Sequence, residues 1–543
     1  MPPRSRTLGD LLDEMAATRP DAEAAVARGA RLTYAALKAR ADELARAFLA
    51  VGVRRGDRVA VILPNRPEWL ITMFAASKVG AITVGVSTFS SPREIAWTIE
   101  HCRPAAIVTL ESFRGRGYLG ALYETCPELA RSAPGQLRSE RLPELRAVVC
   151  VDERRHDGVD RFVDFPARAS EVRERDRAAA QAAVAPADPA YVLYTSGSTA
   201  TPKGVTLAHG GVIANGFDIG ERQHLTVADR VWLAVPLFWS FGSANALPAI
   251  MTHGGALVLQ ESFEPGEALA LLDEERCSVY YGMANMARAM LEHPDRPRRR
   301  LTAMRTGLTI GLPEDIRMTM DAVATRELCN VYGSTETYGN CAVTDAGDPL
   351  ALRLETQGLP LPGMDIRVVD PESERVLGNG EVGELRVKGH VTPGYYAEVE
   401  QTRAAFDPDG YFKTGDLGLI REDGRISFRG RFKEMIKTAG MNVAPLEVEA
   451  ILAGHHAVKQ AYVVGIPDRQ RGELVVAAVE LREGATASAA ALTAFCRERL
   501  ASYKVPARFV FRTADEFPRT PTGKVQKPQL RADLTRHQDG RLG

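Results

Sequence analysis

A regular alternation of short apolar runs and amphipathic segments between residues 57 and 110 constrains the fold most strongly. Three apolar runs have the length of buried strands, and two segments with helical spacing of their apolar residues separate them. Pro67 opens the first of these segments, where a helix does not need the missing N–H. This order predicts a βαβαβ unit, in which parallel strands form a sheet covered by helices. The expected strands are residues 58–63, 81–86 and 105–110, and the expected helices are residues 67–79 and 91–102.

Similar alternation resumes between residues 231 and 328, where a helix over 267–275 is expected to lead into a strand over 277–281. From residue 365 the chain changes to short runs separated by turns, which indicates an antiparallel subdomain. The runs are residues 366–369, 383–388, 418–420 and 425–428. Residues 111–187 are rich in Arg, Glu and Ala and show no recognisable chemistry, so they are interpreted as a helical connector.

A charged segment, residues 429–434, precedes a smaller block with a mixed pattern. That block is expected to contain a helix over 445–452, strands over 460–464 and 475–480, and a helix over 488–500. The fold class predicted is therefore α/β, with two domains. A large N-terminal domain, residues 1–432, would hold stacked βαβ sheets and a small antiparallel β subdomain. A small mobile α+β domain, residues 433–543, would follow it.

Length and composition restrict the class of protein. A chain of 543 residues exceeds the size of a single hydrophobic core, which supports the division into domains. The net charge of −1 gives no electrostatic reason to expect a nucleic-acid partner. Seven scattered cysteines, with no C-x-x-C pair and no apolar segment of membrane-spanning length, are typical of a reducing compartment. We therefore expect a cytoplasmic protein with no membrane insertion.

The loop over residues 194–204 is the richest in chemistry. It follows an apolar run and contains five Ser or Thr residues, two glycines and Lys203. Glycines let a backbone approach an anion closely, and hydroxyl and N–H groups can then surround phosphate oxygens. Because Pro202 precedes the lysine and Gly204 follows it, the loop is not of the Walker type. It predicts a different kind of nucleoside-triphosphate loop.

Four later segments carry further polar groups. Residues 330–337 form a hydroxyl-rich turn with one carboxylate, and residues 411–416 place an aspartate in an expected turn. Residues 430–437 lie at the expected domain boundary, and residues 518–524 present an isolated lysine. A glycine pattern over 378–383 resembles a dinucleotide fingerprint, but it leads into a strand instead of a helix, so it is interpreted as a turn.

In this order and spacing, the five segments closely resemble the adenylate-forming superfamily. Its members include acyl- and aryl-CoA ligases, luciferases and the adenylation domains of peptide synthetases. The resemblance extends from Leu32 to Lys524. It implies that a carboxylate attacks the α-phosphate of ATP, that pyrophosphate leaves, and that a thiol then takes the acyl group from AMP.

The resemblance also implies residue roles. The β- and γ-phosphates would be held by Thr195, Ser196, Gly197, Ser198, Thr199 and Lys203. Adenine would lie beside Gly311, Leu312, Pro313 and Tyr332, and the ribose hydroxyls would bind Asp416 and Arg431. Thr335 would contact the α-phosphate and Glu336 would hold Mg²⁺. Lys433 would be the hinge and Lys524 the catalytic lysine of the first half-reaction, while Lys437, Gly440 and Met441 would face the site in the second.

The chain departs from the family at four positions: Ala200 and Leu312 replace small residues, Glu434 replaces an aspartate, and Trp239 stands where histidine is common. Trp239 either packs in the core or alters the acyl pocket. Since no aspartate follows Phe238 or Phe241, an α-amino acid substrate is not expected. The expected acid pocket has mostly apolar walls with a few hydroxyls, which suits an aryl or medium-chain acid. Its residues are Trp239, Gly242, Ser243, Tyr281, Gly282, Met283, Gly307, Thr309, Gly333, Ser334 and Tyr338.

The sequence thus predicts an ATP- and Mg²⁺-dependent acid–CoA ligase with CoA as co-substrate. The alternative is a stand-alone adenylating enzyme of a specialised pathway that uses a separate carrier protein or a non-thiol acceptor, or that activates a different oxyanion. A nucleotide-sensing homologue without catalysis is a third hypothesis. The presence of both Glu336 and Lys524 argues against it.

Overall fold

The predicted βαβαβ unit is present in the computed structural model, which describes residues 3–195, 202–438, 441–468, 470–520 and 523–539. Strands β3 (Arg58–Ile62), β4 (Ile82–Gly85) and β5 (Ala106–Thr109) are parallel, with β3 in the middle. Helix α3 (Pro67–Lys78) is buried along its whole length, and Ser91 caps helix α4 (Pro92–Cys102).

This unit belongs to an eight-stranded sheet with the order β21-β11-β10-β4-β3-β5-β8-β9, which β21 (Gly394–Tyr395) and β9 (Asp160–Arg161) bound at its two sides. Strand β10 (Pro189–Thr195) lies parallel to β4 and antiparallel to β11 (Lys203–Ala208). Strand β8 (Ala147–Cys150) pairs parallel with β5, so the interpretation of residues 111–187 as a helical connector was wrong. The region does contain helices α5 (Tyr118–Thr125) and α6 (Glu174–Ala182), but its four-residue buried strand is too short to stand out by periodicity.

A nine-stranded sheet has the order β18-β17-β16-β15-β14-β12-β13-β1-β2. Its outer strands are β1 (Glu23–Ala27), β2 (Ala30–Thr33), β17 (Ala342–Val343) and β18 (Leu359–Pro360). Its centre is parallel, so the carboxyl ends of these strands lie along one edge, which we call the carboxyl edge, and their starts lie along the opposite, amino edge. The parallel strands are β12 (Arg230–Leu233), β13 (Ala256–Leu259), β14 (Val279–Tyr281), β15 (Thr306–Thr309) and β16 (Glu327–Tyr332). Helices cover them: α7 (His209–Arg222), α8 (Leu247–Thr252), α9 (Pro265–Glu274), α10 (Ala284–Leu291) and α11 (Pro313–Val323).

One hydrophobic cluster joins the two sheets, since it contains Val61 of β3 as well as Leu233 of β12. The expected antiparallel subdomain follows as a four-stranded sheet of β19 (Asp365–Val369), β20 (Gly383–Lys388), β22 (Phe412–Ile420) and β23 (Ile426–Arg431). Gly380 adopts a φ of +82° in the turn before β20, which confirms that the glycine pattern there is a turn.

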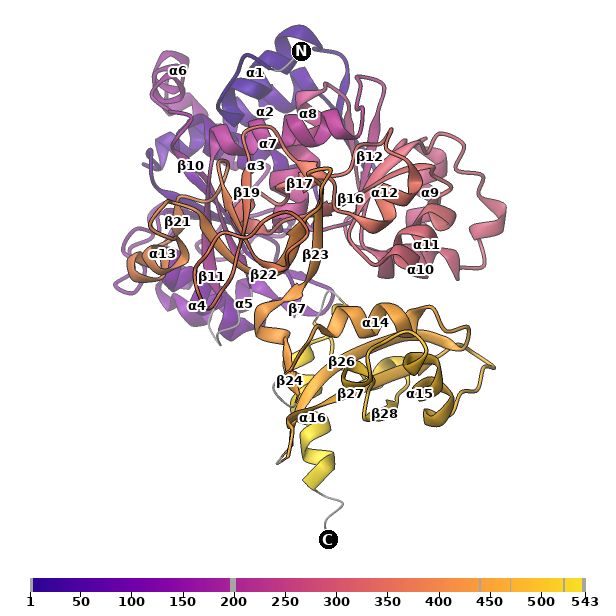
Figure 1. Ribbon diagram of the computed structural model, residues 1–543. Coiled ribbons are helices and arrows are strands. Elements are labelled where there is room, and N and C mark those ends of the chain that lie inside the picture. Colours follow the sequence, from indigo (N-terminus) through magenta and orange to yellow (C-terminus); the bar gives the residue numbers. More distant parts are fainter. Residues whose placement is uncertain (1–2, 196–201, 439–440, 469, 521–522, 540–543) are drawn as a thin grey trace.

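The C-terminal part forms a separate, smaller body beneath the large one (Figure 1). Its two hydrophobic clusters contain only residues from Ile436 onward. The fold class predicted from the sequence is confirmed, whereas the boundary at residue 433 and the mobility of the small body stay predictions. The strands are β24 (Ile436–Thr438), β25 (Met441–Val443), β26 (Val458–Asp468), β27 (Gly472–Leu481) and β28 (Arg508–Phe511), and the helices are α14 (Pro445–Ala453), α15 (Ala489–Arg497) and α16 (Lys527–Asp539).

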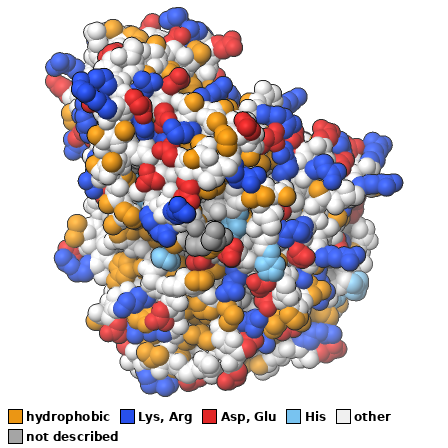
Figure 2. Space-filling model, turned by 90° about the horizontal axis from the view of Figure 1, so that it is seen from above, with side chains coloured by type: hydrophobic (Ala, Val, Ile, Leu, Met, Phe, Trp, Pro, Cys, Tyr) orange, Lys and Arg blue, Asp and Glu red, His pale blue; other side chains and the backbone are white. Residues whose placement is uncertain are grey.

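The surface and the thiols follow ordinary patterns. All seven cysteines are free and buried. Figure 2 shows acidic and basic side chains interspersed over the face that it draws. Among the described residues, no helix combines the length and the apolar character needed to cross a membrane.

Candidate functional site

The loops that follow β12, β14, β15 and β16 all emerge at the carboxyl edge of the nine-stranded sheet. In open α/β sheets, ligands bind outside the carboxyl ends of the strands. These loops carry many of the residues that the sequence singled out, from Trp239 after β12 to Tyr338 after β16. The fold therefore brings together segments that lie about a hundred residues apart in the chain.

Glu336 lies in the single 3₁₀ turn Thr335–Thr337 after β16. Its Oε1 accepts a hydrogen bond of 3.0 Å from the Tyr395 hydroxyl, and its backbone oxygen accepts one of 2.6 Å from the N–H of Thr392. The Nζ of Lys203 lies 4.8 Å from the centre of the Tyr395 ring. Tyr395 thus connects the lysine of the expected phosphate loop with the expected metal ligand.

The surroundings of Glu336 fit a magnesium ion carried in with a nucleotide. The second carboxylate oxygen, Oε2, has no hydrogen-bond partner among the residues that the structure describes. No group of three or more metal-ligating side chains occurs in the described part of the chain. Mg²⁺ is commonly held by one or two carboxylates together with substrate phosphates. The single free oxygen of Glu336 is therefore a suitable protein ligand for a magnesium ion whose other ligands come from the nucleotide and water.

Asp416 lies within strand β22, so its expected position in a turn was wrong. Its side chain is buried, its Oδ2 accepts a hydrogen bond of 3.2 Å from Tyr332, and its Oδ1 forms an ion pair of 3.3 Å with Arg431 Nε. The ion pair lacks hydrogen-bond geometry, which leaves Oδ1 with acceptor capacity. Burial raises the pKa of Asp416 to about 6, although Arg431 acts in the opposite direction.

Tyr332 is buried and stacks on Phe428, with ring centres 5.8 Å apart. This packing directs its hydroxyl to Asp416. The expected neighbours of adenine, Gly311, Leu312 and Pro313, lead from β15 into α11 at the same edge and are partly exposed. Their roles toward a nucleotide stay predictions.

Lys524 comes from the small body. It follows Gly523, which has a φ of +83° and whose added Cβ would lie 2.8 Å from Asn285 Nδ2 in the first turn of α10. The lysine loop therefore packs against the large body. The pKa of Lys524 is lowered, mainly because the surrounding protein atoms partly desolvate its ammonium and also because Arg431 lies nearby. Glu434 and Asp416 act in the opposite direction. The side chain still contacts solvent. Lys524 thus lies among charges from both bodies.

Lys433 lies in the 3₁₀ turn Phe432–Glu434 between β23 and β24, where the chain passes from one body to the other. The partly buried Lys527 holds this turn to the small body through ion pairs of 3.2 Å with Glu434 and 2.8 Å with Glu449. Lys437 is exposed on β24, and its backbone N–H donates to Glu473 of the same body. The structure does not place Lys437 with the groups around Glu336.

Thr195 and Lys203 pair across β10 and β11 and so define the two ends of the expected phosphate loop. Beside it, the Tyr194 hydroxyl lies 2.6 Å from His101 Nδ1. The remaining predicted residues of the loop lie outside the described residues, namely Ser196, Gly197, Ser198, Thr199 and the departure Ala200, as does Gly440 of the second predicted segment.

Trp239 is partly buried among aromatic rings, 6.1 Å from Phe238 and 6.5 Å from Phe89 between ring centres. Its carbonyl oxygen accepts hydrogen bonds from the N–H groups of Gly242 and Ser243. Tyr281 is fully buried and its hydroxyl accepts from Gln223. These contacts are compatible with both interpretations of Trp239, which stay open.

The glycines expected in the acid pocket allow close packing in this structure. A Cβ added to any of them would meet protein atoms at 2.4–2.5 Å. At Gly242 that atom is the Pro236 oxygen, at Gly282 the Tyr280 hydroxyl, at Gly307 the Tyr280 oxygen, and at Gly333 the Cα of Asn340 and the Gly339 oxygen. Their role as pocket walls, with Thr309 and Met283, stays a prediction.

Sequence reasoning missed two residues of this region. Tyr395 could have been noticed from the Gly394-Tyr395-Tyr396 run, which places two aromatic rings after a glycine. Ser240, whose Oγ lies 3.0 Å from Thr335 Oγ1, had no signal of its own because a single serine after an aromatic run is common on loops.

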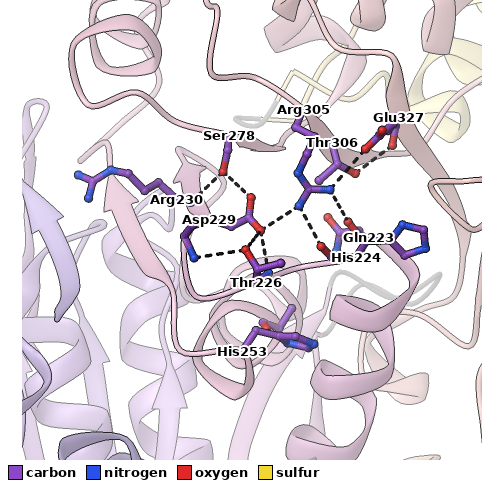
Figure 3. A network of polar contacts seen from close by, with 12 residues as sticks. Gln223, His224, Thr226, Asp229, Arg230, His253, Ser278, Arg305, Thr306 and Glu327 are labelled. Atoms are coloured by element: carbon purple, nitrogen blue, oxygen red, sulfur yellow. Dashed lines mark hydrogen bonds and ion pairs between the residues drawn. The ribbon is translucent and has the colours of Figure 1, made fainter. Parts of the chain in front are cut away.

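A hollow of about 620 Å³ lies at the opposite, amino edge of the sheet, but its polar lining is paired internally (Figure 3). Asp229 accepts from Thr226, Ser278 and Arg305 at 2.7–3.0 Å, and Arg305 also donates to the Gln223 and His224 carbonyls. Arg230 pairs with Glu23 and Glu275. This network joins strand starts and is a structural feature.

Comparisons with known proteins identify the family. The family model described as AMP-binding enzyme matches residues 12–396, and the model for the AMP-binding enzyme C-terminal domain matches residues 447–524. The Bacillus subtilis (strain 168) protein YngI, to which its name attributes an acyl-CoA synthetase activity, is 34% identical over 97% of this chain and 96% of its own length. The mitochondrial medium-chain acyl-CoA ligase ACSF2 of Bos taurus is 32% identical over 98% of this chain and 88% of its own length. ATP-bound MatB from Rhodopseudomonas palustris has a TM-score of 0.83 at 27% identity, covering 97% of this chain and 99% of that structure.

Proposed function

The chain belongs to the AMP-binding enzyme family and is an ATP-dependent adenylate-forming ligase, and from this premise we propose that it is an acid–CoA ligase. It activates a carboxylate with ATP, releases pyrophosphate and transfers the acyl group to the thiol of CoA. The observation that carries the proposal is the meeting of Glu336, the Asp416–Arg431 pair and Lys524 around one edge of the sheet. The relatives YngI and ACSF2, both named for acyl-CoA formation, support CoA as the acceptor.

In the first half-reaction, a carboxylate oxygen attacks the α-phosphorus of ATP, and the bond from that phosphorus to the pyrophosphate oxygen breaks. Negative charge gathers on the α-phosphate oxygens in the transition state. The Lys524 ammonium neutralises part of that charge, and the Thr335 hydroxyl donates a hydrogen bond to it. Preorganised charge of this kind is usually the largest single contribution to catalysis.

Glu336 would hold a magnesium ion, which would supply further charge neutralisation when bound. Tyr395 orients the Glu336 carboxylate through its hydroxyl and keeps Lys203 close through its ring. Asp416 accepts hydrogen bonds from the ribose hydroxyls, and Arg431 steadies it. The nucleotide is thereby held through its phosphates, at Lys203 and Glu336, and through its ribose, at Asp416. Its α-phosphate then faces Lys524.

In the second half-reaction, the thiol sulfur bonds to the acyl carbonyl carbon, the bond to the AMP oxygen breaks, and the thiol proton goes to solvent. Lys524 has no part in this step. The small body, residues 433–543, turns about Lys433 and brings the segment with Lys437, Gly440 and Met441 toward the acyl-adenylate.

The acid is an aryl or medium-chain carboxylate. The aromatic cluster of Phe89, Phe238 and Trp239 beside Gly242 and Ser243 supports an apolar substrate body. The reaction takes place in the cytoplasm, an expectation that rests on composition alone.

Acid-dependent pyrophosphate release tests this function. A panel of aryl and straight-chain acids is incubated with ATP and Mg²⁺, with and without CoA, and the products are identified by mass. We expect an acyl-AMP without CoA and an acyl-CoA with it. Pyrophosphate release that no acid stimulates would contradict the proposal. An acyl-AMP that CoA does not consume would show that the enzyme uses an acceptor other than CoA.

A further inference from the structure

The chain segment that enters helix α8 contains a π-helical stretch, Phe241–Ala246, directly after Ser240. In a π-helix, residues five positions apart lie above one another, and such stretches often occur at functional sites. Ser240 and Asn245 are five apart, and both face the loop over 333–340. Ser240 Oγ lies 3.0 Å from Thr335 Oγ1, and a Cβ added at Gly339 would lie 2.9 Å from Asn245 Nδ2.

Asn245 and Asn340, on the two facing segments, are completely buried. Among the residues that the structure describes, neither amide has a hydrogen-bond partner for its Nδ2 or for its Oδ1. Burying an amide without partners costs free energy, and buried side-chain amides in native proteins are normally bonded. Two such amides on facing segments therefore require a reason.

Other buried asparagines of the same body show what ordinary pairing looks like. Asn65 Nδ2 donates to the carbonyls of Leu233 and Val235, and its Oδ1 accepts from the N–H of Leu237. Asn330 likewise uses both ends of its amide, with Thr356 and Val331. Asn215, Gln223 and Gln260 each leave only the amide oxygen unpaired, whereas the amide nitrogen donates. Among the described residues, a buried amide without a partner at either end therefore occurs only at Asn245 and Asn340.

The backbone beside the two amides is held firmly. The Tyr338 hydroxyl accepts from the N–H of Ala208, and the Tyr338 carbonyl accepts from Asn215 Nδ2. Tyr338 itself has a φ of +57°, and a Cβ at Gly211 would collide with its ring at 2.4 Å. The loop is therefore positioned on both sides, while Asn215 Oδ1 and Ser334 Oγ nearby remain without partners in the described part of the chain.

We propose that Asn245 and Asn340 recognise an uncharged hydrogen-bonding group of the acid, a hydroxyl or an oxo group. An amide offers a donor and an acceptor, which suits either group. Ser240 lies beside Thr335, where the carboxylate of the acid would react, and Asn245 lies one helical turn further along. The hydroxyl or oxo group is therefore expected on the order of 5 Å from the carboxyl carbon of the acid. Residues 240–246 and 333–340 contain one carboxylate and no cation, which disfavours a second carboxylate in the acid. The inference rests on the proposed function and specifies the substrate class of that same site.

The test compares hexanoic acid with its hydroxy and oxo derivatives at the penultimate carbon, roughly four bonds from the carboxyl carbon. The readout is kcat/KM for acid-dependent exchange between ATP and labelled pyrophosphate. A site built to bond a polar group strongly disfavours an analogue that lacks it. We expect the better derivative to exceed the parent acid by more than about tenfold in the natural protein.

Asn245→Leu and Asn340→Leu should each remove this preference. The KM for ATP should not change in either variant, and the melting temperature should stay the same or rise. Asn65→Leu is the matched control: it removes a fully paired buried amide and should lower the melting temperature without changing the acid preference. Equal activity on all three acids in the natural protein, or a preference that survives both variants, would overturn the inference while leaving adenylation intact. Exchange that no acid in a wider panel supports would overturn the proposed function itself.

Discussion

The two edges of the nine-stranded sheet treat their polar groups in opposite ways. At the amino edge, Asp229 and Arg305 are surrounded by partners from three strand starts (Figure 3). Arg230 is paired on both sides with carboxylates. At the carboxyl edge, Asn245 and Asn340 have no partners among the described residues, Asp416 has a raised pKa, and Lys524 has a lowered one.

This difference distinguishes polar groups that stabilise the fold from polar groups that are available to bind a ligand. A hollow of about 620 Å³ lies at the amino edge, yet the charges that line it already neutralise one another. At the carboxyl edge, Asn245, Asn340 and Asp416 have polar atoms without hydrogen-bond partners among the described residues, and a ligand can complete them. The pairing of polar groups is therefore a better guide to the site than the presence of a hollow.

The largest effect is expected for Lys524→Ala at the carboxyl edge. Formation of the acyl-adenylate should slow by roughly 10²–10³ because one charge that faces the transition state is lost. Thiol attack on supplied acyl-AMP should stay within about twofold, since Lys524 has no part in that step. Single-turnover measurement of both half-reactions checks this, and an equal loss in both would remove the assignment.

Glu336→Gln should reduce adenylation by about 10² and raise the magnesium concentration needed for half-maximal rate. Tyr395→Phe is the matched variant, because it keeps the ring beneath Lys203 but removes the hydrogen bond to Glu336. It should cost roughly tenfold and shift the magnesium dependence in the same direction. Magnesium titrations of both variants that overlay the natural protein would show that Glu336 is not the metal ligand.

The pH dependence of ATP binding tests Asp416. Because burial raises the pKa of Asp416 to about 6, the carboxylate takes up a proton as the pH falls through that value. It then loses its capacity to accept both ribose hydroxyls, so the KM for ATP should rise below pH 6 by up to about tenfold per unit. Asp416→Asn should show a high KM that responds much less to pH. If the KM for ATP had the same pH profile in the natural protein and in the variant, a role for this carboxylate would be excluded.

The smallest effect on activity is expected at the amino edge. Asp229→Ala removes the common partner of Thr226, Ser278 and Arg305, and should lower the free energy of unfolding by on the order of 3 kcal/mol. The kcat of the protein that remains folded should not change. Denaturant unfolding followed beside activity distinguishes the two, and a loss of kcat in fully folded protein would make the amino edge a functional region.

The sequence predicted those features of the fold that depend on repeated local patterns. The βαβαβ unit over residues 58–109 and the antiparallel strands after residue 365 are found within a residue or two of their expected bounds in most cases. Strand β8 was missed because four buried residues within a helical and polar region carry no period. Asp416 was placed in a turn because Gly415 precedes it, whereas the strand β22 continues through that glycine at a φ of +69°.

The candidate site divides in the same way. Residues in dense polar loops, such as Glu336 and Lys524, could be selected from the sequence and its resemblance to a family. Asn245 and Asn340 could not, since a buried amide acquires meaning only when the lack of partners is seen in three dimensions. Tyr395 also depends on the fold, because β21 must pair with β11 before its hydroxyl reaches Glu336.

Exchange of labelled pyrophosphate into ATP, without CoA, tests the assignment of the chemistry to the carboxyl edge most directly. It is measured in parallel for the natural protein, Lys524→Ala and Asp229→Ala at a temperature where all three are folded. We expect acid-dependent exchange in the natural protein and in Asp229→Ala, and a loss of roughly 10²–10³ in Lys524→Ala. Exchange that persists in Lys524→Ala, or that disappears in folded Asp229→Ala, would contradict this assignment.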